Sequence, residues 1–188
     1  LHDMAADIAA VIEADGCGPT IVAGHAAGNW VARMLAHDRP DLVRGVAMLA
    51  ALLGTASDPS IRGSITGSFD PGLTDAQRLA HLRRAYFAPG NDASVWLGGW
   101  HAEVARAQRE AADATTDRAW LRAAEAKPLL YLAAAQDVIA KPPTLAELRE
   151  ALGPMASLVM IDGAGHALIP EQPGATADAL IAWARGLA

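Results

Sequence analysis

A short glycine-rich stretch, "IVAGHAAGNW" at residues 21–30, has the spacing of a site that could do chemistry. An apolar run leads into Gly24 and Gly28, which enclose three residues, and a helical pattern follows. This arrangement predicts the tight strand-to-helix turn that is called a nucleophile elbow when a serine occupies its centre. The central residue here is Ala26. Because a methyl group has no lone pair, covalent catalysis through this position is excluded.

Two further residues could act as an acid–base pair. Asp137 lies in "AAAQDVIAKP" and His166 in "DGAGHALIPEQP", each directly after an apolar stretch typical of a strand. A histidine can serve as general base while a carboxylate holds its other ring nitrogen. The carboxyl ends of parallel strands meet at one edge of a sheet, so we expect both side chains to lie near Ala26. Asp162 is an alternative partner, but its place at the end of a strand favours a role in a turn.

The elements that must position these residues follow an alternating pattern. Strands are predicted near 20–24, 45–50, 128–134 and 157–162, and helices occupy most of the connections. Consecutive crossovers of this kind predict one parallel sheet with the strands in chain order. The fold class is therefore α/β, a parallel sheet with crossover helices.

The middle of the chain interrupts this pattern. Gly, Ser and Pro punctuate 54–72, and helical stretches are predicted at 74–87 and 93–112. We interpret residues 52–126 as a helical lid inserted into a core of residues 1–51 and 127–188. The lid contains Tyr86, Phe87, Trp96, Trp100 and Trp120. Such aromatic residues usually pack within an insertion, and those facing the core could also contact a ligand.

Composition excludes several classes of partner. The 188 residues are 52% hydrophobic and 19% charged, with a formal net charge of −6, as in ordered acidic proteins. No basic run suggests a nucleic-acid partner, and no apolar run reaches membrane-spanning length. Cys17 is the only cysteine, which favours a reducing, cytoplasmic location. No metal-ligand spacing or phosphate-binding glycine loop is present, so we expect no metal or cofactor.

The order of elbow, Asp137 and His166 resembles the α/β-hydrolase superfamily. The stretches "GHAAGNWVARMLAHDRPDLVRGVAML" and "DGAGHALIPEQP" are particularly similar to its members. The resemblance implies an elbow, Asp and His site for ester or amide hydrolysis, with Ala26 at the nucleophile position. It also implies that the backbone N–H of Ala27 contributes to an oxyanion hole. Tyr86, Trp96 and Trp100 would then contact a small, apolar substrate.

The resemblance also implies strands ahead of the helix predicted at the start of this sequence. In the family, that region supplies half of the oxyanion hole and covers the strand at 20–24. We therefore expect an N-terminal segment, or self-association through this strand, to cover its edge.

Three functions remain open. The chain could be a hydrolase whose serine was replaced by alanine through engineering. It could instead be a natural, non-hydrolytic relative, either a small-molecule binder or a lyase or cofactor-free oxygenase that uses His166 and Asp137 as a general base. It could also be a scaffold without activity. The run Ala27-Gly28-Asn29 departs from the family's more usual continuation of a small residue followed by two glycines, which favours a natural alanine.

Overall fold

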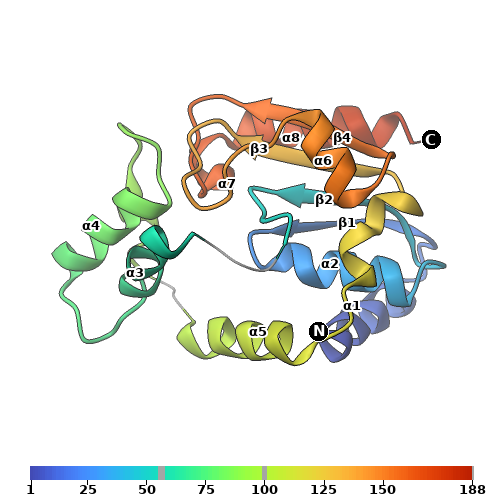
Figure 1. The fold of residues 1–188 in the computed structure, drawn as a ribbon, viewed down its shortest axis with the longest axis horizontal. Coiled ribbons are helices and arrows are strands. Elements are labelled where there is room, and N and C mark those ends of the chain that lie inside the picture. The colour runs from blue at the N-terminus through green and yellow to red at the C-terminus, as the bar shows by residue number, and fades with distance from the viewer. Residues whose placement is uncertain (55–57, 99–100, 188) are drawn as a thin grey trace.

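The computed structural model describes residues 1–54, 58–98 and 101–187 (Figure 1). The strands are β1 (Thr20–His25), β2 (Val43–Leu49), β3 (Leu129–Ala134) and β4 (Ala156–Ile161). The helices that cover the sheet or follow its strands are α1 (His2–Asp15), α2 (Gly28–Asp38), α6 (Leu145–Leu152), α7 (Leu168–Glu171) and α8 (Pro173–Arg185). Between β2 and β3 lie α3 (Pro59–Gly67), α4 (Asp75–Ala85), η1 (Ala93–Trp96), α5 (Ala102–Ala114) and η2 (Ala119–Glu125), where η marks a 3-10 helix.

The four strands form one parallel sheet in the order β1-β2-β3-β4. This confirms the predicted fold class and strand order. The two central strands are the most buried, and every residue of β3 is buried, as expected for a strand covered on both faces. Among the described residues, the outer edge of β1 has no strand partner.

Helices cover both faces of the sheet. One apolar core lies under α1, α2, η2 and α6, and it includes Met34, Met48 and Trp120. A second core lies on the opposite face, where α8 packs over Leu130 and Leu132 of β3. Because the strands are parallel, the connections after β1, β3 and β4 leave from the same edge of the sheet.

The segment between β2 and β3 is helical. Figure 1 shows α3 and α4 beyond the carboxyl ends of the strands, whereas α5 runs back toward α1. Helix α4 begins with a capping box formed by Thr74 and Gln77, which satisfies backbone groups that a helix start leaves unpaired. Two details differ from expectation. Helix α3 lies in the glycine- and serine-rich stretch, where Asp58 caps it and Pro59 starts it. The helical region expected over 93–112 is divided into η1 and α5.

A third apolar core joins this helical segment to the sheet edge. It contains Leu82, Tyr86 and Phe87, and it also contains Ile139 from the loop after β3 and Ala167 from the loop after β4. The loops that carry Asp137 and His166 therefore pack against α4 and the residues that follow it. This contact places the helical segment beside the predicted site.

Candidate active site

The turn between β1 and α2 has the backbone shape of an elbow. Ala26 lies in the left-handed region with a φ of 49°, a conformation that costs energy for a residue with a Cβ. Its N–H donates to Leu49 O at 3.0 Å. Its carbonyl accepts from the backbone N–H of Asn29 at 3.2 Å and from Asn29 Nδ2. The left-handed turn is thus retained although its central side chain is a methyl group.

Gly24 explains why the turn can be so tight. A Cβ added at Gly24 would lie 2.4 Å from Gly28 O and 2.5 Å from Asn29 N. Helix α2 therefore crosses directly over the end of β1. The second glycine is different, because a Cβ at Gly28 would meet no atom within 4 Å. Within the described residues, the N–H of Ala27 donates no hydrogen bond, so it is available to a bound ligand.

Asp137 and His166 meet at the same edge of the sheet. His166 Nδ1 lies 2.8 Å from Asp137 Oδ2, and the exposed fractions of the two side chains are 5% and 0%. The other carboxylate oxygen, Oδ1, accepts from the backbone N–H groups of Ile139 at 2.7 Å and Ala140 at 2.9 Å. Because the carboxylate only accepts, His166 Nδ1 donates the proton. His166 Nε2 has no hydrogen-bond partner among the described residues and can exchange a proton with a ligand.

The elbow touches the His166 loop through His25. Its Nε2 donates to the backbone carbonyl of His166 at 2.7 Å, and the two rings lie 5.4 Å apart. Burial is the main cause that lowers the pKa of His25 to about 4, and the nearby His166 contributes. His25 is therefore neutral near pH 7 and acts as a hydrogen-bond donor.

Aromatic side chains from the helical segment surround the two histidines. The Tyr86 ring lies 5.6 Å from that of His166, and the Trp96 ring lies 6.0 Å from that of His25. Tyr86 and Phe87 also contact Trp96, with ring centroids 5.6 Å and 5.4 Å apart. Burial raises the pKa of Tyr86, so its phenol stays protonated. The structure thus brings Tyr86 next to His166 and Trp96 next to His25, whereas Trp100 lies outside the described residues.

Several residues at this edge were not singled out by their sequence pattern. His25, within the elbow, bonds to the backbone carbonyl of His166. Glu171, in "HALIPEQP", accepts hydrogen bonds from the backbone N–H of Gly165 and from Ala88. Asn91 donates to Glu171 and to Gly163 O. Proximity of Glu171 to His166 in sequence was a usable signal, but nothing in the sequence indicated Asn91.

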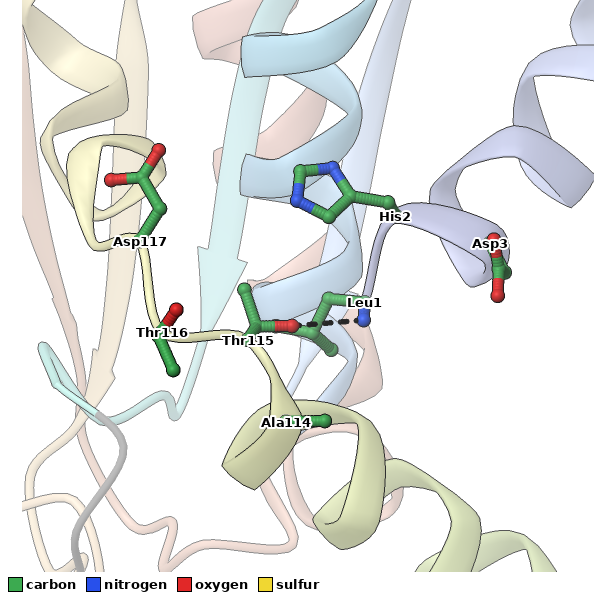
Figure 2. A pocket seen from close by; sticks show the side chains of 7 residues that line it. All are labelled: Leu1, His2, Asp3, Ala114, Thr115, Thr116 and Asp117. Carbon is green, nitrogen blue, oxygen red and sulfur yellow. Dashed lines mark hydrogen bonds between the residues drawn. The ribbon is translucent and has the colours of Figure 1, made fainter.

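A surface pocket of about 330 Å³ lies elsewhere, where the end of α5 meets the start of α1 (Figure 2). Its lining residues are Leu1, His2, Asp3, Ala114, Thr115, Thr116 and Asp117. The amino group of Leu1 donates to Thr115 Oγ1 at 3.0 Å there. No predicted site residue lines this pocket.

The described residues, 1–54, 58–98 and 101–187, contain neither a metal-binding cluster nor a membrane-spanning helix. No group of three His, Cys, Asp or Glu side chains is arranged to hold a metal ion. No helix in these ranges has the length and apolar character needed to cross a bilayer.

A model of the Alpha/beta hydrolase family matches residues 1–179 of the chain. The chain belongs to the alpha/beta hydrolase family. This match spans the elbow, Asp137 and His166, and it agrees with the parallel sheet and its helices.

Solved structures with this fold include proteins of several activities. A protein from Mycobacterium tuberculosis H37Rv assigned as a non-heme bromoperoxidase is 24% identical, with a TM-score of 0.72 over 98% of this chain and 73% of that one. A thermophilic esterase from Thermogutta terrifontis is 21% identical, with a TM-score of 0.63 over 99% of this chain and 72% of that one. The 2-hydroxy-6-oxo-6-phenylhexa-2,4-dienoate hydrolase from Rhodococcus sp. strain RHA1 is 19% identical, with a TM-score of 0.66 over 90% and 65% of the two chains. No curated protein sequence gives a significant match.

Proposed function

We propose that this chain binds a small, largely apolar molecule between His166 and the helical segment, and that it does not hydrolyse esters through a covalent intermediate. The observation that carries the proposal is Ala26, which occupies the left-handed centre of the elbow with a φ of 49°. A serine at this position is the attacking group of hydrolases with this turn. A methyl group can neither attack a carbonyl nor be acylated.

The surroundings of His166 support the binding part of the proposal. Tyr86, Phe87 and Trp96 form an aromatic group whose rings contact one another and the two histidines. Ligand sites are typically apolar with a few placed polar groups. Here the polar groups are His166 Nε2 and the N–H of Ala27. We assign the helical segment of residues 52–126 the role of a lid over this site.

A second candidate function is general-base chemistry without a covalent step, as in a lyase or a cofactor-free oxygenase. The observation that favours it is the bond from His166 Nδ1 to Asp137 Oδ2 at 2.8 Å. The carboxylate fixes the tautomer and stabilises an imidazolium, so Nε2 can accept a proton from a bound carbon or oxygen acid. This chemistry needs no group on residue 26.

The proposal is tested with a fluorophosphonate probe and p-nitrophenyl acetate. We expect the unmodified chain to show no labelling of residue 26 and no turnover above background. Ala26→Ser should become labelled at residue 26, because His166 can take its proton. The matched control is Ala27→Ser, which places the same hydroxyl one residue away and should stay unlabelled.

Turnover by Ala26→Ser is expected to remain low. Only one oxyanion donor, the N–H of Ala27, is identified among the described residues, and loss of one such donor costs about 3–4 kcal/mol of barrier in known hydrolases. Ester hydrolysis by the unmodified chain that His166→Ala abolishes would overturn the proposal. If the rate of p-nitrophenol release is the same whichever residue stands at position 26, the result would instead favour the general-base candidate.

A further inference from the structure

The short helix α7 ends at Glu171, five residues after His166, and its carboxylate joins two parts of the molecule. Oε2 accepts from the backbone N–H of Gly165 at 2.8 Å. Oε1 accepts from the backbone N–H of Ala88 at 2.7 Å and from Asn91 Nδ2 at 2.6 Å. One oxygen thus holds the residue before His166, and the other holds the segment that follows α4.

The same two parts are also joined by hydrogen bonds that do not involve the carboxylate. The N–H of Ala167 donates to Tyr86 O at 2.8 Å, and Asn91 Nδ2 also donates to Gly163 O at 2.9 Å. A Cβ added at Gly165 would lie 2.7 Å from Tyr86 O, so the loop leaves no space for a side chain there. Both chain neighbours of His166, Gly165 and Ala167, are therefore bound to the same segment or to the carboxylate that holds it.

We propose that Glu171 is a positioning residue that fixes His166 relative to residues 86–91, so that the geometry of the Asp137–His166 pair depends on the helical segment. The role is one of hydrogen bonding. Among the described residues, no Lys or Arg forms an ion pair with Glu171. All three of its partners are N–H donors, and they occupy both carboxylate oxygens. The inference concerns the placement of His166 and goes beyond the proposed function.

The donor arrangement makes Glu171→Gln an informative variant. A carboxylate accepts at both oxygens, whereas an amide has one acceptor and one donor. If the amide oxygen of glutamine faces Gly165, its NH₂ meets the N–H of Ala88 and the NH₂ of Asn91. If the oxygen faces those groups, the NH₂ meets the N–H of Gly165. Either orientation places donor against donor on one side, so one half of the link is lost.

The matched control is Glu110→Gln, which removes the same charge from an exposed position of α5. Amide hydrogen exchange and the ring ¹⁵N resonances of His166 are measured by NMR on the full chain. In Glu171→Gln we expect the N–H of Gly165 or of Ala88 to exchange about five- to tenfold faster, as for one lost hydrogen bond. The His166 ring resonances should move, and amides of β3 should not change.

A merely structural Glu171 gives a different result. It would lower the melting temperature while the His166 ring resonances of the folded chain stayed as in Glu110→Gln, and this outcome would overturn the inference. If Glu171→Gln does not fold, Asn91→Ala provides the test, because it leaves the carboxylate and its bond from the N–H of Ala88 intact and removes the side-chain donor to Glu171 and Gly163. Unchanged His166 resonances in that variant would also overturn it. Neither readout is turnover, so the result is independent of the proposed function.

Discussion

The elbow at residues 24–28 and the His166 loop at residues 163–171 lie side by side, but they are held by different forces. The elbow depends on backbone packing, since Gly24 allows helix α2 to cross the end of β1. The His166 loop depends on polar side chains. Asp137 binds the ring of His166, and Glu171 binds the N–H of Gly165.

The difference explains how the elbow keeps its shape without a nucleophile. No bond that holds Ala26 uses its side chain, because Leu49 and Asn29 contact only its backbone N–H and carbonyl. The turn therefore needs no hydroxyl at residue 26. The shape of the His166 loop, in contrast, depends on side chains, because removal of a polar side chain from it leaves buried hydrogen-bond donors unpaired. The following expectations test this contrast.

The largest effect is expected from Gly24→Ala. The new Cβ would lie 2.4 Å from Gly28 O and 2.5 Å from Asn29 N, and backbone atoms cannot move aside as flexible side chains can. We expect the free energy of unfolding to fall by about 3 kcal/mol, the upper range for overpacking. Gly28→Ala is the control, since it meets no atom within 4 Å, and it should raise stability slightly by stiffening the unfolded chain. Urea unfolding of both variants measures the difference, and equal losses would contradict the backbone account of the elbow.

A medium effect on the pH dependence of stability is expected from replacing His25, which connects the two regions. Burial lowers the pKa of His25 to about 4 in the folded protein, below its unfolded value. The unfolded chain therefore binds more protons between pH 6.5 and pH 4, and stability falls as the pH drops through this range. We expect His25 to contribute a loss on the order of 2 kcal/mol, given its partial exposure. His25→Gln can still donate to His166 O but does not titrate. Unfolding measured from pH 4 to pH 8 should show a shallower pH dependence in the variant, and parallel profiles would refute the assignment.

The smallest effect is expected at the centre of the elbow. Ala26 has a φ of 49° and its neighbour Ala27 a φ of −61°. Glycine relieves the left-handed strain at residue 26 but adds freedom to the unfolded chain, so Ala26→Gly should raise stability by about 0.5 kcal/mol. Ala27→Gly has no strain to relieve and should lower stability by about 1 kcal/mol. Thermal unfolding distinguishes the two signs, and a loss in both variants would show that residue 26 is not strained.

The fold was largely predictable because its signals are local. Apolar runs of strand length, separated by helical patterns, predicted the sheet and its order, and these are confirmed. Helix α3 was missed because its glycines and serines obscure the pattern, although Asp58 and Pro59 form a standard helix start. The helical region predicted at 93–112 is divided into η1 and α5, because residue spacing alone does not show where a helix is interrupted.

Within the candidate site, only the residues that directly follow a strand could be predicted from the sequence. Asp137 and His166 follow β3 and β4, so the convergence of parallel strand ends suffices to place them together. Tyr86 and Trp96 were proposed from the family resemblance, and their contacts with the two histidines rest on how α4 and η1 pack. His25 and Asn91 show the limit, because each bonds to a residue far away in the sequence, and no periodic pattern encodes such a pair.

The sequence by itself determined that residue 26 cannot attack a carbonyl, since this follows from the identity of one side chain. It also determined the strand order, because consecutive crossovers between parallel strands allow few alternatives. Only the tertiary structure decided what surrounds His166. Bonds to Asp137, His25 and Tyr86 join its loop to three separate parts of the chain. Long-range hydrogen bonds of this kind depend on the packing of whole elements to within a fraction of an ångström, which no local pattern of residues specifies.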